Sequence, residues 1–164
     1  ERPPNDDRAN AFEVPAGVCP ITLVECVYGQ TPEPGETFDG LGDNAVPGSG
    51  LVLNSSVWFR YEPTVSSTDV IIRTYRTHPD EFLDTTTYDT ILVVYDSDMN
   101  VIDSNDDFSA PGSFSLSQVT IDVVAGQTYW IQVVGQGGDE GVLYLTIDSE
   151  CFQAYWGINA STPT

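Results

Sequence analysis

Polar and hydrophobic residues alternate along most of this chain, with the period of two that is typical of β-strands. In residues 57–62 the odd-numbered positions are Val, Phe and Tyr, whereas the even-numbered positions are Trp, Arg and Glu. The two sets therefore fall on opposite faces of a predicted strand. The same alternation predicts strands in five further segments, namely residues 21–28, 69–76, 119–123, 129–133 and 143–147.

A different pattern marks residues 88–96. Five hydrophobic residues stand in a row at 91–95, which predicts a strand that is covered on both faces. A turn at 97–98 and the segment that follows it predict a hairpin partner. Asp89 and Asp96 stand at the two ends of the central strand. Because aspartate is rare inside strands, these positions indicate a turn or an ion site.

Turn-forming residues separate the predicted strands, and the chain has 11 prolines and 14 glycines. At the N-terminus, residues 5–7 predict an Asx cap for one helical turn at 8–12, followed by a brief strand at 12–14. Eight or nine short strands predict an all-β fold, an antiparallel β-sandwich of the jelly-roll type. We assign residues 1–149 to this sandwich and residues 150–164 to a C-terminal aromatic tail.

The charge of the chain is extreme, with five Lys+Arg against 25 Asp+Glu and a formal net charge of −20. Such a chain is repelled by nucleic acid and by anionic membranes, and no hydrophobic run is long enough for a membrane span. The carboxylates either form a solubilising surface or gather around cations. The acidity, the low lysine content and two Asn-x-Ser sequons, at 54–56 and 159–161, predict an extracellular or cell-surface protein exported in the bacterial manner.

Three cysteines are present, Cys19, Cys26 and Cys151. In an oxidising compartment two of them would pair and one would remain. Because Cys19 and Cys26 flank one predicted strand, we expect one of these two to bond with Cys151 and join the first strand to the last. The remaining cysteine is then either buried and inert or bonded to another subunit.

Seven short motifs occur in a recognisable order, at residues 5–11, 33–36, 56–61, 88–96, 104–107, 125–133 and 141–147. The ordered set resembles the bacterial pre-peptidase C-terminal domain and is similar to the collagen-binding domains of clostridial collagenases. The resemblance covers about residues 4 to 148, nearly the whole chain. It implies a secreted, non-catalytic β-sandwich, in several members with calcium bound at the N-terminal segment. Asn5 and Asp6 match that segment, whereas Pro3 stands where collagenase-type members have a glutamate.

Calcium is therefore the main chemical hypothesis. It is a hard ion that takes six to eight oxygen ligands from carboxylates, amides and carbonyls. We expect four separate segments to supply these ligands at one end of the sandwich, from Asn5, Asp6, Glu33, Glu36, Asp89, Asp106 and Asp107. The long loop at 30–50 would then have a role of its own. The alternative is that the Asn-Asp-Asp triplets form Asx turns and the loop is simply solvated.

Hydrolysis is the competing class of function. A serine triad would need His78, the only histidine, which stands before a proline in a predicted turn with no nucleophile elbow nearby. No pair of acids is singled out for glycoside cleavage. We therefore expect a protein that is not an enzyme.

The C-terminal tail is hydrophobic and uncharged over most of its length. Its large side chains, Phe152, Tyr155, Trp156 and Ile158, either fold back onto the sandwich or add to a neighbouring subunit as an edge strand. A head-to-tail contact would propagate into a filament. We expect a self-associating structural or adhesive subunit of a surface appendage or filament. The alternative is a targeting module of a secreted hydrolase that grips an extracellular polymer through exposed aromatics such as Trp58 and Trp130.

Overall fold

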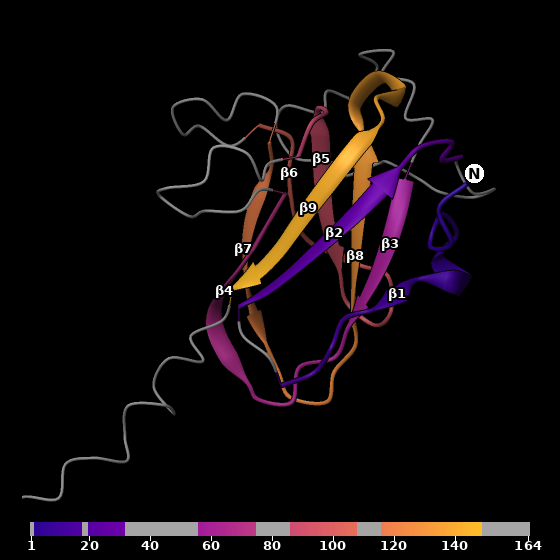
Figure 1. Cartoon of the computed structure of the whole chain (residues 1–164). Helices are drawn as coiled ribbons and strands as arrows, with labels where there is room; N and C mark the ends of the chain where they lie inside the picture. Colours follow the sequence, from indigo (N-terminus) through magenta and orange to yellow (C-terminus); the bar gives the residue numbers. More distant parts are fainter. Residues whose placement is uncertain (1, 18–19, 32–55, 75–85, 108–115, 149–164) are drawn as a thin grey trace, which may run out of the picture.

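The computed structural model describes residues 2–17, 20–31, 56–74, 86–107 and 116–148 (Figure 1). Within these ranges the chain forms nine strands and two short 3-10 turns. The turns are η1 (Arg8–Asn10) and η2 (Gln136–Gly138). The strands are β1 (Phe12–Glu13), β2 (Ile21–Val27), β3 (Ser56–Tyr61), β4 (Ser67–Arg73), β5 (Thr90–Tyr95), β6 (Val101–Asn105), β7 (Gln118–Val123), β8 (Tyr129–Gly135) and β9 (Gly141–Asp148). No helix in the described part of the chain is long and apolar enough to cross a membrane.

The strands form two sheets packed face to face. One sheet has the order β1-β3-β8-β5-β6 and the other has the order β2-β9-β4-β7. The predicted all-β antiparallel sandwich of eight to nine strands is confirmed. One pairing differs from the prediction, because β1 runs parallel to β3, with Phe12 opposite Phe59.

The core lies between the two sheets and is built by the alternation seen in the sequence. In β3, the side chains of Val57, Phe59 and Tyr61 are buried in it, as the period of two requires. Strand β5 lies between β8 and β6, and all six of its residues are buried. The prediction of a central strand covered on both faces is therefore confirmed.

A second, smaller hydrophobic cluster covers the outer face of the five-stranded sheet. It contains Trp58, Ile91, Val93, Tyr95 and Val134, with Ala11, Met99 and Trp130 packed against them. The Arg8 guanidinium lies over the rings of Trp58 and Trp130, 5.9 and 5.8 Å from their centroids. Trp58 is only 3% exposed, so its expected role as an exposed aromatic grip is wrong. Trp130 is half-buried in the same cluster.

The N-terminal segment contains the predicted helical turn, which is η1. The predicted Asx cap is wrong, because Asp7 makes no side-chain cap hydrogen bond and its carboxylate instead pairs with Arg2. The backbone of this segment joins the sheet beside it, since the Trp58 N–H donates to the Asn5 carbonyl at 2.9 Å and the Val14 N–H to the Arg60 carbonyl.

The predicted hairpin is formed by β5 and β6, which lie side by side in Figure 1. Its register places Leu92 opposite Asn105. Because the pairing is antiparallel, the residue that precedes β5 and the residues that follow β6 lie at the same end of the sandwich. These residues are Asp89 on one side and Asp106 and Asp107 on the other.

Candidate metal centre

Three carboxylates gather at the end of the β5–β6 hairpin. Asp89 precedes β5, and Asp106 and Asp107 follow β6, each with a carboxylate oxygen within 4.8 Å of the others. Calcium–oxygen bonds are about 2.3 to 2.6 Å long, so two ligands on opposite sides of one ion are about 5 Å apart. The spacing of the three oxygens therefore fits a single calcium ion.

The turn after β8 lies against this cluster, which we call the acidic cluster. The Gln136 Nε2 donates to both carboxylate oxygens of Asp106, at 3.1 and 3.0 Å, and the Gln136 N–H donates to the Asp89 carbonyl at 3.0 Å. Gly137 and Gly138 adopt φ of 66° and 88°, a conformation that other residues rarely adopt. Gln136 lies beside the cluster because β8 pairs with β5 and places Gly135 opposite Thr90.

The electrostatics of the acidic cluster disfavour its full ionisation. Burial, and after it the charges of Asp106, Asp107 and Asp139, together raise the pKa of Asp89 to about 6. The pKa of Asp106 is also raised, first by burial and then by Asp107, although the hydrogen bond from Gln136 opposes the shift. The Asp89 Oδ1 is buried and has no hydrogen-bond partner. A cation at this place would neutralise the repulsion and bind the unpaired oxygen.

Three of the described arginines, Arg2, Arg60 and Arg73, pair with carboxylates outside the acidic cluster. The chain has no lysine, and its salt bridges within the described residues are Arg2–Asp6, Arg2–Asp7, Arg60–Glu13, Arg60–Glu62 and Arg73–Asp148. None of these pairs includes a carboxylate of the acidic cluster. Among the described residues no ion pair offsets the charge of this cluster, and a bound cation or protons would do so.

The two N-terminal candidates lie in a different polar node. Asp6 is buried and accepts hydrogen bonds from the Thr31 N–H at 2.6 Å, from the Thr31 hydroxyl at 2.8 Å and from Arg2. Asn5 is also buried, and its Nδ2 donates to Glu25 at 2.9 Å and to the Trp58 carbonyl at 3.2 Å. The acidic cluster does not include Asp6.

Unpaired oxygens are also present around this N-terminal node. The Asn5 Oδ1, the Gln30 Oε1 and the Tyr88 hydroxyl are buried without a hydrogen-bond partner. Burial raises the pKa of Glu25, against the effect of its hydrogen bond from Asn5. Burial also raises the pKa of Tyr88, with the charge of Glu25 as a second cause. The predicted ligands are thus divided: Asn5 retains one free oxygen, whereas both oxygens of Asp6 are engaged by protein donors.

The remaining predicted site residues lie outside the described residues. They are Glu33, Glu36, Cys19, Cys151, Phe152, Tyr155, Trp156 and Ile158, and His78, which a serine triad would need, lies outside as well.

Cys26 is an exposed, free cysteine within the described part of the chain, opposite Val142 in the pairing of β2 with β9. Cys19 and Cys151 lie outside the described residues, so the expected bond between one of the first two cysteines and Cys151 stays a prediction.

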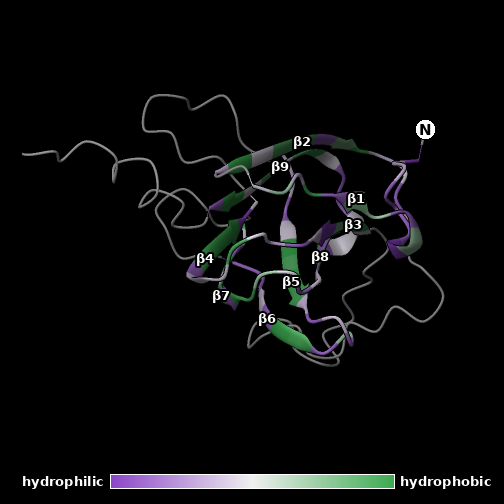
Figure 2. Ribbon diagram, turned by 90° about the horizontal axis from the view of Figure 1, so that it is seen from below, coloured by the Kyte–Doolittle hydropathy of each residue, from purple (hydrophilic) through white to green (hydrophobic). Residues whose placement is uncertain are grey.

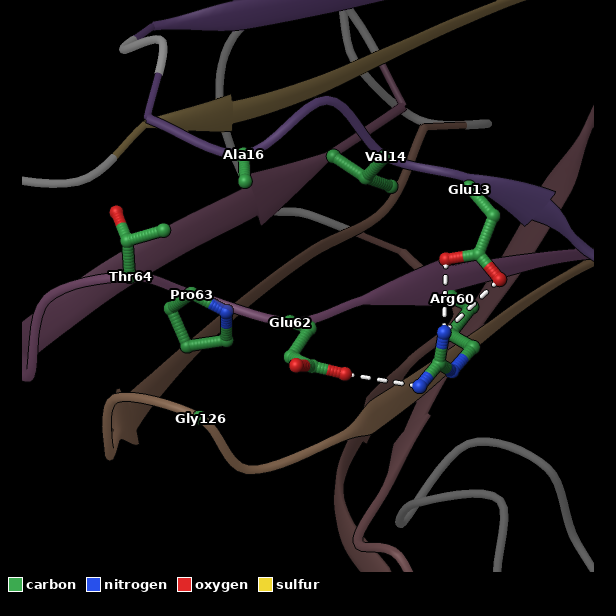
Figure 3. A pocket seen from close by; sticks show the side chains of 8 residues that line it. All are labelled: Glu13, Val14, Ala16, Arg60, Glu62, Pro63, Thr64 and Gly126. Carbon is green, nitrogen blue, oxygen red and sulfur yellow. Dashed lines mark hydrogen bonds and ion pairs between the residues drawn. The ribbon is translucent and has the colours of Figure 1, made fainter.

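A hollow of about 460 Å³ lies on another part of the surface (Figure 3). Its charged residues are bonded to one another: Arg60 donates to both oxygens of Glu13, at 2.9 and 3.0 Å, and to Glu62 at 2.8 Å. Val14, Ala16, Pro63, Thr64 and Gly126 complete its lining. The arginine is thus already paired with two carboxylates.

The sequence interpretation missed three residues that shape these sites, namely Gln136, Asp139 and Glu25. A signal for Gln136 and Asp139 existed, because they stand in the glycine-rich turn that directly follows the strand at 129–135. Knowing that this strand pairs with β5 would have placed the turn beside Asp89. Glu25 gave no such signal, since its contact with Asn5 depends on how the N-terminal segment crosses the sheet.

The chain was compared with family models, with curated proteins and with solved structures, and none of them matches it.

Proposed function

We propose that this chain is an exported, non-catalytic β-sandwich that calcium stabilises and that serves as a self-associating structural or adhesive subunit of a surface appendage or filament. The sandwich architecture and the ordered motifs support a relationship to pre-peptidase C-terminal domains. The expected export agrees with the calcium part of the proposal, because extracellular modules typically bind calcium with dissociation constants of about 10⁻⁴ to 10⁻³ M.

The observation that carries the proposal is the acidic cluster. Asp89, Asp106 and Asp107 converge within 4.8 Å, Asp89 keeps a buried oxygen without a partner, and the salt bridges among the described residues lie elsewhere. Carboxylates are hard oxygen ligands, so the donor set favours calcium over the softer transition metals. Calcium would tie the start of β5 to the end of β6 and would thereby stabilise this end of the sandwich.

The alternative of a polymer-gripping module has less support. Trp58 is buried and Trp130 is half-buried beneath Arg8, so these two rings do not form an open aromatic platform. We therefore retain the structural subunit as the proposed function.

The test is sedimentation velocity of the purified chain over a range of concentrations, with 1 mM calcium or with chelator, followed by electron microscopy of any assemblies. We expect concentration-dependent assembly in calcium and a lower melting temperature in chelator. A chain that stays monomeric at every concentration would overturn the subunit role. An unchanged melting temperature would overturn the role of calcium.

A further inference from the structure

Strand β2 is the longest open edge among the strands that the structure describes. It is the outer strand of the four-stranded sheet and pairs only with β9 within the described residues. Figure 2 shows β2 at the border of the molecule, with β9 on its inner side. At the opposite border the edge strands of the two sheets, β6 and β7, lie in contact with each other. The remaining edge strand, β1, has only two residues. Among the described residues no strand pairs with the outer backbone groups of β2.

The composition of β2 offers little protection against such pairing. Natural edge strands are protected by charged side chains, especially lysine, by proline, by a β-bulge or by a covering segment. β2 has neither lysine nor proline, and its seven residues pair with β9 without any register shift. Its one charged residue, Glu25, is half-buried and bonded to Asn5. Val24 is 59% exposed, and the next residue after the strand, Tyr28, is 52% exposed.

The chain itself contains a segment suited to this edge. Residues 151–164 carry no Asp, Glu, Lys or Arg, although the whole chain has a net charge of −20. The seven residues at 152–158 match β2 in length and contain Phe152, Tyr155, Trp156 and Ile158. Adding an extended segment to an open sheet edge gains main-chain hydrogen bonds, and the side chains supply specificity. An uncharged segment also avoids repulsion from the acidic surface of a neighbour.

Chain reach favours the segment of a second copy over the segment of the same copy. β9 ends at Asp148, beside the start of β2, and the far side of β2 is two strand spacings away from β9, about 10 Å. Residues 149–151 span about 10 Å when fully extended. They would have to cross over the start of β2 and also reverse direction. A second copy meets no such constraint and can approach antiparallel to β2.

We propose that the open edge of β2 accepts residues 152–158 of a second copy as an added antiparallel strand. This inference rests on the proposed self-association and names its acceptor and its donor. Each copy then has one acceptor edge and one donor segment. The contact is heterologous, so it propagates into a filament unless it closes into a ring.

The test uses variants of the whole 164-residue chain, and each variant blocks one side of the contact. Val24→Lys places a charge on the acceptor edge, and Trp156→Asp places one in the donor segment. Val124→Lys is the matched control, because Val124 is 50% exposed and lies outside β2, just after β7. The unfolding midpoint of each variant is measured first, so that only folded chains are compared. Assembly is then followed by sedimentation velocity.

We expect Val24→Lys and Trp156→Asp each to weaken assembly about tenfold or more, whereas Val124→Lys assembles like the unaltered chain. Mixing the two blocked variants restores one contact, between the intact donor of Val24→Lys and the intact acceptor of Trp156→Asp. The mixture should therefore form one-to-one dimers at concentrations at which each variant alone stays monomeric.

The failures of the two proposals are distinguishable. An unaltered chain that never assembles would refute the self-association itself. Normal assembly of Val24→Lys in a chain that does self-associate would refute β2 as the acceptor and leave the subunit role standing. An unaltered monomer whose tail is protected from protease, and exposed by Val24→Lys, would show that the tail folds back on its own copy.

Discussion

An aspartate stands at each end of strand β5, and the two carboxylates have opposite surroundings. At the far end, Asp96 accepts hydrogen bonds from the Asp98 N–H, the Asn100 N–H and the Asn100 Nδ2 at 2.8 to 2.9 Å. These bonds lower its pKa. At the near end, Asp89 has a buried oxygen without a partner, and burial and neighbouring acids raise its pKa to about 6.

The difference comes from where the partners stand in the sequence. Asp96 is satisfied by residues two and four positions away, in a turn where Met99 adopts a φ of 66°. Asp89 meets Asp106, which is brought to it by the hairpin, and lies beside the turn after β8. A local turn can neutralise an aspartate through backbone donors alone, whereas a gathering of acids needs protons or a cation.

The largest expected effect comes from Gly141, which supports the near end. A Cβ at this residue would lie 2.4 Å from the Thr87 Oγ1 and 3.0 Å from the Tyr88 ring. Gly141→Ala should therefore displace the segment that leads into Asp89 and lower the free energy of unfolding by about 2 to 3 kcal/mol. Urea unfolding measures this loss.

The control for this substitution is Gly126→Ala. Gly126 has a φ of 74° and nothing within 4 Å of a built Cβ, so the change adds backbone strain but no clash. We expect it to cost about 1 kcal/mol. If Gly141→Ala cost no more than this control, the close packing assigned to the near end would be wrong.

A smaller effect is expected at the far end. Asp96→Ala removes the acceptor of three hydrogen bonds and should lower the melting temperature by a few degrees. The calcium response should stay intact, because Asp96 does not belong to the acidic cluster. Asp98→Ala, which removes one exposed charge from the same turn, is the matched control and should leave the melting temperature nearly unchanged. Loss of the calcium response in Asp96→Ala would contradict the separation of the two ends.

The two ends should also differ in pH dependence when calcium is removed. The folded pKa of Asp89 is about 6 and its ordinary value is 3.8, so the folded state binds the proton more tightly. Its contribution to stability is present below about pH 4 and is lost as the pH rises through about 6. Because Asp89 is half-buried, solvent screening reduces the contribution to about 1 kcal/mol.

Asp96 acts in the opposite direction, because its pKa is lowered in the folded state. Its contribution to stability is present above the ordinary pKa of 3.8 and is lost as the pH falls below it. Melting curves between pH 3.5 and pH 7 in chelator, with Asp89→Asn beside the unaltered chain, separate the two contributions. Asp89→Asn should reduce the loss of stability that the unaltered chain shows between about pH 4 and pH 6. An unchanged slope would show that Asp89 is not the group that titrates there.

Strand identity was predictable because it depends on local alternation. The hairpin of β5 and β6 was predictable too, and with it the meeting of Asp89 with Asp106 and Asp107. The sequence does not reveal that Arg8 and the turn at Met99 cover the outer face of the sheet, so the burial of Trp58 was missed.

The position of Asp6 could not be predicted from the sequence either. Its neighbours Arg2 and Thr31 both carry donors, but only the three-dimensional path of the N-terminal segment decides whether the carboxylate meets them or a shared ion. The sequence pattern thus identifies candidate ligands, whereas the order of the strands decides which of them meet.

The most direct test of the account is the effect of calcium on the stability of three chains: the unaltered protein, Asp89→Asn and the charge-matched control Asp98→Asn. With a dissociation constant of about 10⁻⁴ to 10⁻³ M, 1 mM calcium should add about 0.4 to 1.4 kcal/mol to the free energy of unfolding. We predict that the unaltered protein and Asp98→Asn gain this stability and that Asp89→Asn does not. An equal gain in all three chains, or no gain in any, would contradict a calcium site formed by Asp89, Asp106 and Asp107.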